Sequence, residues 1–274
     1  MDYSIRLLSA ASCTEEVHGK SRNMIYLFGT TKDGEAIAVR TPLLMPYFQV
    51  VEPPKDICKS LEKKDDVEKL ESLVLWVDGE EKKCIKVTVS HPGKVPKIRE
   101  WLKNNDLKLL AADIPFHHRY LYDNDIGGCI RVRGKEIQKE GWSCKVIEVV
   151  EVLPSESFES DFKILSFDIE NSIFKRMIYC LSYCIKTSEG YTHEETLHGD
   201  EEKLLNDFVK VIKEHDPDII TGYNIDGYDL PLLVERAEVY GVKLAIGRDG
   251  TNLEQKFQRF WQARGRVIVD AWWN

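Results

Sequence analysis

The chain has 274 residues, of which 43% are hydrophobic and 31% charged, and this balance is typical of a folded globular protein of about two domains. Its longest apolar stretches are only as long as a strand and its first residues are weakly apolar, so we expect neither a membrane span nor a secretory signal. The formal net charge of −8 argues against a broad basic surface for phosphate contacts. It is compatible with an acidic site that meets phosphates through bound cations.

The first half of the chain predicts an α+β module. Residues 23–41 read as a hairpin around Lys32-Asp33-Gly34. The elements that follow are predicted in the order strand, helix, strand, strand, helix, strand, at residues 46–53, 54–64, 72–77, 84–90, 95–105 and 107–115. This is the ferredoxin-like βαββαβ order, which occurs in proteins of many functions.

Residues 131–162 predict a joint between domains. They contain one expected strand, at 144–152, and then a stretch rich in Pro, Ser and Glu. We therefore place the boundary near residues 155–161, which gives domains of 1–158 and 159–274.

The second half predicts a different module. Strands are expected at residues 162–170, 177–186 and 190–197, and a helix that begins after an Asp200 N-cap follows them. Its apolar stripe consists of Leu204, Leu205, Phe208, Val211 and Ile212. A strand at 218–224, a helix from Pro231 that ends before Gly241, and a last strand at 265–273 complete the pattern. Three strands followed by helix, strand and helix is the order of a ribonuclease-H-like nuclease, so the fold class is α/β overall.

Seven cysteines are scattered along the chain without a C-x-x-C pair. Their odd number and spacing favour reduced thiols in a cytoplasmic protein over a zinc site or a disulfide framework.

A first acidic motif, "FDIE", ends the strand at 162–170. Asp168 and Glu170 lie two residues apart, so in a strand both side chains point to the same face, with roughly 6.6 Å between their Cα atoms. Paired carboxylates suit hard cations such as Mg²⁺ or Mn²⁺, and two such ions can hold the attacking water and the leaving oxygen of a phosphodiester. The alternative is a solvated pair at a strand end.

A second acidic motif, "YNIDGYD", follows the strand at 218–224. It places Asn224, Asp226 and Asp229 just before a helix, whose N-terminus favours a negative charge. Two simpler readings stay open here: Asp229 as an ordinary N-cap, and Asp226-Gly227 as a turn.

Together the two motifs resemble the proofreading 3′-5′ exonuclease of family B DNA polymerases, with tyrosine in the phenylalanine place of the second motif. The neighbouring segments "KEHDPDIITGYN" and "LVERAEVYGVKLAIGRDG" are similar to the archaeal branch, and so are "VSHPGKVPKIREWL" and "DIPFHHRYLYDNDI" in the first half. The resemblance implies that Asp168, Glu170 and Asp229 bind the two metal ions. It also implies that Asn224 and Tyr228 position the 3′ end of the primer strand, from which a nucleoside 5′-monophosphate is released.

The chain departs from the family where it ends. The third exonuclease motif, Y-x-x-x-D, and the polymerase motifs are missing, and Asp270 belongs to the strand before the third motif. We therefore expect a shortened polymerase, or a natural subunit of a split one, with weak or no exonuclease activity by itself. The resemblance further implies DNA (primer 3′ end and single-stranded template), the remainder of the polymerase chain and a sliding clamp as partners, no membrane, and a place near the nucleoid of an archaeal cell.

The same resemblance implies a pocket that captures template uracil. The matching positions are Pro46, Tyr47, Val95, Ile114, Pro115, Phe116 and Arg119. A flipped-out base needs a flat apolar slot and a cation for its phosphate, which this set offers. Core packing is the alternative for Val95, Ile114 and Phe116.

Two other functions stay open: a self-contained exonuclease, which needs a third acidic motif within the chain, and a non-catalytic module that binds DNA or senses template damage.

Overall fold

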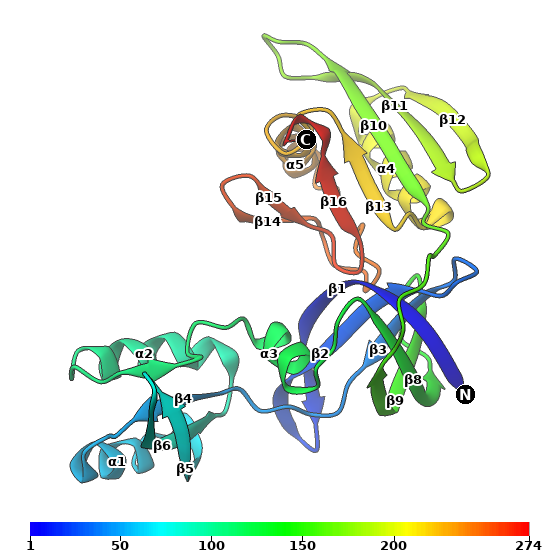
Figure 1. Ribbon diagram of the computed structural model, residues 1–274. Coiled ribbons are helices and arrows are strands. Elements are labelled where there is room, and N and C mark those ends of the chain that lie inside the picture. Colours follow the sequence, from blue (N-terminus) through cyan, green and yellow to red (C-terminus); the bar gives the residue numbers. More distant parts are fainter. Residues whose placement is uncertain (274) are drawn as a thin grey trace. The chain divides into compact units, whose positions relative to one another are not determined.

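Figure 1 shows a computed structural model of the protein, in which residues 1–273 are described. The chain forms two compact units. One consists of Met1–Ala11, Tyr26–Thr41 and Ile126–Asn274, and the other of Ser12–Ile25 and Pro42–Asp125. None of the helices in the described part of the chain is long and apolar enough to cross a bilayer.

Five strands close into a small barrel in the order β1-β2-β3-β9-β8. Their bounds are Asp2–Val17 (β1), Lys20–Thr30 (β2), Ala36–Arg40 (β3), Cys129–Ile137 (β8) and Lys145–Pro154 (β9). The hairpin predicted around Gly34 connects β2 to β3, and Gly34 has the positive φ of 80° that such a turn requires. The barrel itself was not predicted.

The expectation of a single strand within 131–162 was wrong, because β8 and β9 both lie in this region. In β8, buried Ile130 and Val132 alternate with exposed Arg131 and Arg133. This is the period-two pattern of a half-buried strand, but its charged outer face resembles a linker in the sequence. The predicted domain boundary falls between β9 and the next strand and stays a prediction.

The second unit contains the ferredoxin-like core in the predicted order. Its elements are β4 (Tyr47–Val51), α1 (Lys55–Glu62), β5 (Val67–Val77), β6 (Glu80–Val89), α2 (Val95–Lys103) and β7 (Leu109–Leu110), with a 3₁₀ turn at Pro92–Lys94 before α2 and helix α3 (Phe116–Asp123) after β7. The sheet order is β5-β6-β4-β7 with antiparallel neighbours, as the βαββαβ chain order requires. Strand β7 is shorter than predicted, because Ala111 takes a left-handed φ of 57° directly after it.

The apolar face of α2 packs on this sheet as its spacing predicts. Ile98 and Leu102 are buried together with Phe48 and Val87, and Val95 packs at the edge of this cluster. Both helices α1 and α2 contribute to the same core, so they cover one face of the sheet.

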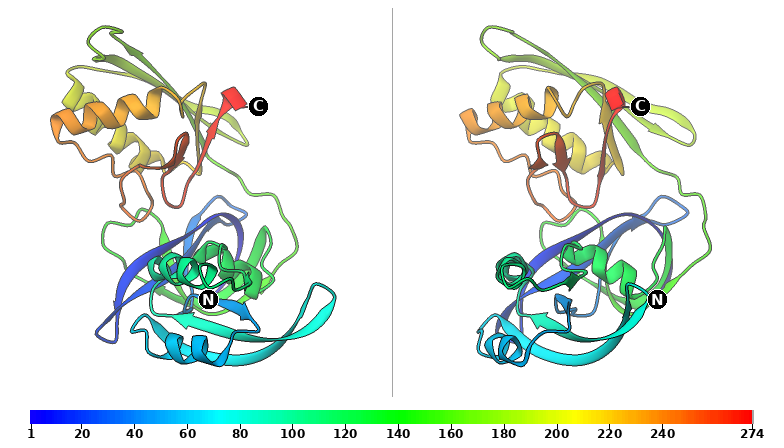
Figure 2. Two further views of the ribbon diagram at one scale, coloured as in Figure 1. Left: turned by 90° about the vertical axis from the view of Figure 1, so that its left-hand side faces the viewer. Right: turned by 60° about the vertical axis from the view of Figure 1, so that its left-hand side comes forward.

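The nuclease-like sheet has the order β12-β11-β10-β13-β16. Its strands are β10 (Ile164–Asn171), β11 (Ile178–Thr187), β12 (Gly190–His198), β13 (Ile219–Gly222) and β16 (Val267–Asp270). The first three are antiparallel, whereas β13 and β16 are parallel to β10, and this confirms the ribonuclease-H-like order (Figure 2). A hairpin of β14 (Glu254–Phe257) and β15 (Phe260–Gln262), which was not predicted, precedes β16, and a 3₁₀ turn at Ala271–Trp273 follows it.

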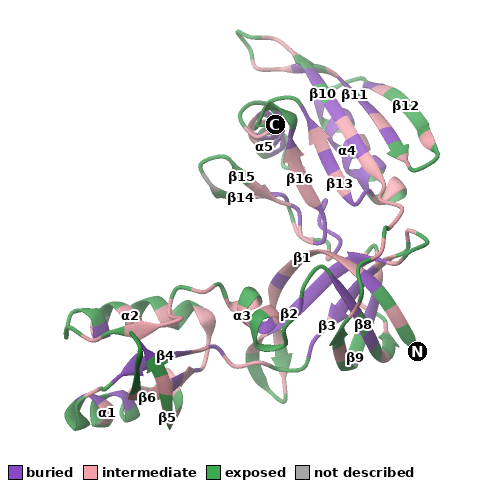
Figure 3. Cartoon of the chain, in the orientation of Figure 1, coloured by how far each residue is buried: buried purple, intermediate pink, exposed green. Residues whose placement is uncertain are grey.

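Helices α4 (Glu201–His215) and α5 (Asp229–Tyr240) bury their apolar sides in the core of this sheet (Figure 3). The predicted N-cap is confirmed, since Asp200 accepts a hydrogen bond of 2.9 Å from the backbone N–H of Lys203. Helix α5 begins at Asp229, two residues before its predicted start at Pro231. A proline fits there because the N–H groups of a first turn have no partner within the helix.

Buried charges join the barrel to the nuclease sheet. Arg248, which is 1% exposed, donates to Asp218 over 2.8 Å, and the Thr30 hydroxyl on β2 donates to the same carboxylate over 2.7 Å. Arg266 pairs with Asp216 beside them at 2.8 Å. Every member of this group has a charged or hydrogen-bonding partner, which its burial requires.

Candidate functional site

The two faces of strand β10 differ: one carries carboxylates and the other packs into the apolar core. Leu165, Phe167 and Ile169 are buried on the face that α4 and α5 cover, and the Phe167 ring lies 5.2 Å from that of Phe208. Asp168 and Glu170 are exposed. Because side chains alternate along a strand, the buried set fixes the two carboxylates on the open face of the sheet.

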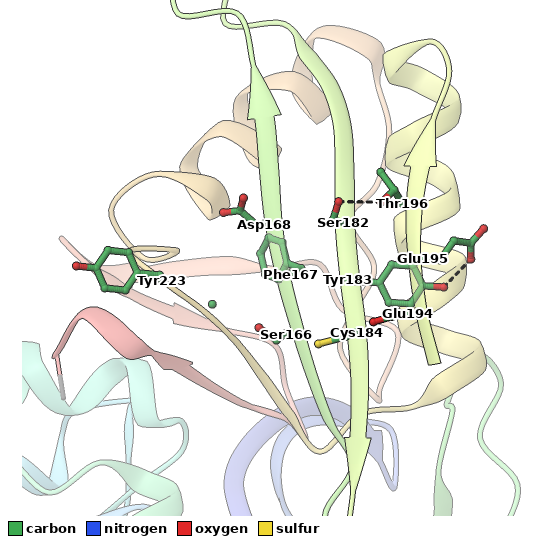
Figure 4. A pocket seen from close by; sticks show the side chains of 11 residues that line it. Ser166, Phe167, Asp168, Ser182, Tyr183, Cys184, Glu194, Glu195, Thr196 and Tyr223 are labelled. Atoms are coloured by element: carbon green, nitrogen blue, oxygen red, sulfur yellow. Dashed lines mark hydrogen bonds between the residues drawn. The ribbon is translucent and has the colours of Figure 1, made fainter. Parts of the chain in front are cut away.

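A polar hollow of about 700 Å³ lies on this open face (Figure 4). Its floor consists of cross-strand neighbours, Asp168 opposite Ser182 and Ser182 opposite Thr196, and it runs from β10 over β11 to β12. The full lining is Ser166, Phe167, Asp168, Ser182, Tyr183, Cys184, Glu194, Glu195, Thr196, Gly222 and Tyr223. Glu170 does not line it, although it shares the face with Asp168.

The loop after β13 passes close to β10. A Cβ on Gly222 would lie 2.5 Å from the carbonyl oxygen of Phe167, so only glycine permits this approach. Asn224 then takes a left-handed φ of 59°, a conformation that asparagine tolerates better than most residues. The loop therefore brings the second motif beside the strand that carries the first.

Asp229 is the one buried carboxylate of the predicted set, at 4% exposed. Burial, and then the neighbouring Asp168 charge, raise its pKa to about 6, while the backbone N–H groups of Asp229 and Ile169 act in the opposite direction. These influences place the Asp229 carboxylate against β10, close to Asp168. Its reading as an N-cap was wrong, because Tyr228 is the N-cap residue and Asp229 is the first residue of the helix.

Tyr228 and Asn224 are exposed at the border of the open face. The Tyr228 hydroxyl donates a hydrogen bond of 3.0 Å to Asn171 Oδ1, which connects the start of α5 to the end of β10. The Asn224 carbonyl accepts from the backbone N–H groups of Gly227 and Tyr228, so Asp226-Gly227 does form a turn.

The donors of this site suit a hard divalent cation. Asp229 lies close to Asp168, and Glu170 shares the open face of β10 with Asp168. The raised pKa of Asp229 means that its charge is poorly compensated in the protein alone. A cation beside it would reverse this, because positive charge favours the ionised form. Within residues 1–273, however, no group of three or more His, Cys, Asp or Glu side chains is already arranged to hold a metal ion. Asp168, Glu170 and Asp229 thus have the ligand chemistry that a divalent cation requires, but they do not by themselves form a complete metal site.

The seven residues predicted for uracil capture line a single small pocket of about 190 Å³ in the second unit. Its other lining residues are Pro92, Pro96, Arg99, Ala111, Ala112 and Asp113. This volume is below the range of drug-sized sites, so the pocket suits only a small group. Core packing accounts for Val95 only in part, since it contacts both the core cluster and the pocket.

Tyr47 forms a wall of this pocket. Its ring lies between two cations, with Arg119 Cζ at 4.1 Å and Lys86 Nζ at 4.0 Å from the centroid. Its hydroxyl donates to Asp123 and accepts a hydrogen bond from Arg119. Burial raises the pKa of Tyr47, while the bond from Arg119 lowers it. The ring is therefore fixed in place.

A comparison with known protein families identifies part of the second half of the chain. Residues 171–271 match the family described as "DNA polymerase family B, exonuclease domain". The chain carries the exonuclease domain of a family B DNA polymerase. The match begins one residue after Glu170, so the carboxylates of β10 directly precede it.

Similarity to archaeal family B polymerases extends over most of the chain. A DNA polymerase of Archaeoglobus fulgidus is 40% identical over 83% of this chain and 30% of its own length. One from Pyrococcus glycovorans is 31% identical over 76% of this chain and 25% of its own length. The solved family B DNA polymerase of Pyrobaculum calidifontis superposes with a TM-score of 0.83 at 29% identity, covering 98% of this chain and 36% of that one. The chain thus spans less than a third of the length of these two curated relatives.

Asp270 supports the second motif of this exonuclease domain in a way that sequence reasoning missed. Its carboxylate is 5% exposed and accepts backbone N–H bonds from Asn224 (2.8 Å), Asp226 (3.0 Å) and Trp272 (2.9 Å). It therefore holds the loop between β13 and α5. The sequence offers one signal for this role, an aspartate at the end of a strand parallel to β13.

Asp226 is the other acid of the second motif, and it lies in the turn before α5. Burial and the Asp270 charge raise its pKa to about 6, and its Oδ1 atom is buried without a hydrogen-bond partner. It does not line the hollow, and it is not one of the three predicted metal ligands.

Proposed function

We propose that this chain is the N-terminal and proofreading part of an archaeal-type family B DNA polymerase that removes mispaired nucleotides from the primer 3′ end. The observation that carries the proposal is the Asp229 carboxylate, buried beside Asp168 with its pKa raised to about 6. A carboxylate in this state is poised to exchange a proton for a cation. We also propose the two domains 1–158 and 159–274.

Asp168, Glu170 and Asp229 would hold two Mg²⁺ or Mn²⁺ ions. Bound there, such ions supply charge neutralisation for the phosphodiester and lower the pKa of a water molecule. The exposed Asn224 and Tyr228 would contact the terminal nucleotide, and Asp270 would keep their loop in position. Hydrolysis would then release a nucleoside 5′-monophosphate.

Thermal unfolding with and without Mn²⁺ tests this site independently of catalysis. We expect Mn²⁺ to raise the Tm of the parent chain and of Glu202→Gln, a control at an exposed carboxylate on α4, but not that of Asp168→Asn or Asp229→Asn. An equal rise in all four proteins would contradict the ligand assignment.

For these 274 residues alone we propose weak or no trimming of single-stranded DNA, because the carboxylates present do not close a metal site within residues 1–273. A 5′-labelled single strand incubated with Mg²⁺ or Mn²⁺ measures this. Efficient shortening that Asp168→Asn abolishes would contradict the weak activity but support the site.

The small pocket supports a second candidate function, recognition of uracil in the template strand. Its seven matching residues line one cavity, and Arg119 lies at its wall where a nucleotide phosphate would need a cation. Fluorescence anisotropy with single strands that contain uracil or thymine at one position tests this. We expect tighter binding of uracil and loss of the preference in Val95→Phe, which fills the pocket. Equal binding of both strands by the parent chain would contradict the proposal.

The remaining partners follow from the proposed parent enzyme. They are primer and template DNA, the remainder of the polymerase chain and a sliding clamp, within the cytoplasm and near the nucleoid of an archaeal cell.

A further inference from the structure

Strand β5 is the free edge of the ferredoxin-like sheet. Within residues 1–273 it pairs only with β6, although it is 11 residues long (Figure 1). The outer side of such a strand presents backbone N–H and C=O groups that can pair with another strand. Natural proteins usually protect edges of this length with charges, prolines or bulges.

Only the first half of β5 is protected in this way. It contains a register shift between Val67 and Lys69, and the charged residues Glu68, Lys69 and Glu71. The second half, residues 73–77, is the sequence LVLWV, with five apolar residues and no charge. Val74 is 58% exposed and Trp76 is 73% exposed. An uncharged, exposed apolar edge of this kind favours pairing with another strand.

A groove of about 650 Å³ lies beside the same half of the strand. It is lined by Glu52, Pro53, Cys58, Ser72, Leu73, Val74, Lys83, Cys84 and Ile85. Ser72, Val74 and Trp76 alternate with Leu73 and Leu75 and so share one side of the strand. Trp76 therefore lies on the same side of β5 as Ser72 and Val74, two of the groove residues, but does not itself line the groove.

We propose that β5 pairs antiparallel with β5 of a second copy of this chain, about a two-fold axis at Val74. In this register Val74 faces Val74 of the other copy, and Leu73 faces Leu75. Ser72 faces Trp76 of the other copy. Because Ser72 lines the groove, each Trp76 indole is brought over the groove of its neighbour.

The strand is self-complementary in this register, and for this reason the occupant is a second copy. None of the opposed pairs within 71–77 brings two like charges together. Pairing about Val74 extends only to Glu71 opposite Val77, because β5 ends there, and the charged residues Glu68 and Lys69 lie beyond the paired segment. An isologous contact of this kind has twofold symmetry. Its small apolar area predicts a weak, reversible dimer.

Charge substitution at the axis tests the register. We expect sedimentation velocity to show a concentration-dependent dimer for the parent chain. Val74→Lys and Val74→Glu should each be monomeric, since each opposes like charges at the axis. An equal mixture of V74K and V74E chains should restore the dimer. Val150→Lys, at a valine of the barrel that is 75% exposed, should dimerise like the parent chain.

Trp76→Ala provides a second measurement, with an expected increase in the dimer Kd of tenfold or more because an aromatic anchor is lost. A parent chain that stays monomeric at every concentration overturns the proposal. So does a dimer that V74K leaves intact, or a mixture of V74K and V74E chains that stays monomeric. The result is independent of nuclease activity.

Discussion

The two sheets are built alike but leave different surfaces open. Each packs two helices on one face around an apolar core. The nuclease sheet exposes carboxylates and hydroxyls on its other face, whereas the ferredoxin-like sheet exposes an apolar edge. The described residues contain six buried charged side chains, Glu201, Asp218, Asp229, Arg248, Arg266 and Asp270, and all belong to the nuclease half. The nuclease half therefore combines an apolar core with buried charge pairs, whereas the described residues of the ferredoxin-like sheet form an apolar core without buried charges.

The largest expected effect comes from breaking the buried ion network. Arg248→Met should lower the free energy of unfolding by about 3–5 kcal/mol, because it leaves the buried Asp218 and the half-buried Asp216 with fewer partners. Chemical denaturation measures this. Arg259→Met, at an exposed arginine, should change stability by less than about 0.5 kcal/mol. An equal loss in both variants would show that the buried ion network adds nothing beyond an exposed arginine.

Asp229→Asn should reveal the cost of a buried carboxylate. The folded-state pKa of about 6 lies above the ordinary 3.8, so the protonated form stabilises the fold and this stability is lost as pH rises through about 6. Without divalent cations, the variant should be more stable than the parent by roughly 2–3 kcal/mol near pH 8. The difference should vanish below about pH 4. Urea denaturation at both pH values measures it, and a pH-independent difference would reject this cause.

Asp270→Asn should loosen the loop that carries the second motif. An amide keeps one acceptor oxygen where the carboxylate accepts three backbone N–H bonds, so we expect a loss of about 2 kcal/mol. Hydrogen exchange should show faster exchange of the amides of Asn224 and Asp226. Unchanged protection of both amides would show that the hydrogen bonds to Asp270 are not needed to hold the loop.

The smallest effect concerns the link between β10 and α5. Tyr228→Phe and Asn171→Ala should each cost about 1 kcal/mol or less, because the hydrogen bond is partly exposed to solvent. A double-mutant cycle should give a coupling of about 0.5 kcal/mol. Additive effects would mean that the 3.0 Å contact contributes nothing to stability.

Regular periodicity made most of the fold predictable. The stripe of α4 and the βαββαβ order were read from spacing alone, and both agree with the structure. The barrel escaped prediction because barrel closure depends on pairing between strands far apart in sequence, such as β1 with β8. Strand β8 itself was missed because its charged outward residues outnumber the buried ones in residues 131–137.

The sequence by itself determined that Asp168 and Glu170 share a face, since the alternation of a strand leaves no other arrangement. It also determined that Asp229 lies near the N-terminus of a helix. Only the tertiary structure decided that Asp229 is buried against β10. It also decided that Asp270 accepts backbone N–H bonds from the loop between β13 and α5. Burial and electrostatic coupling depend on which strands become neighbours in space, and in this chain the parallel strands β10, β13 and β16 bring together residues about a hundred positions apart.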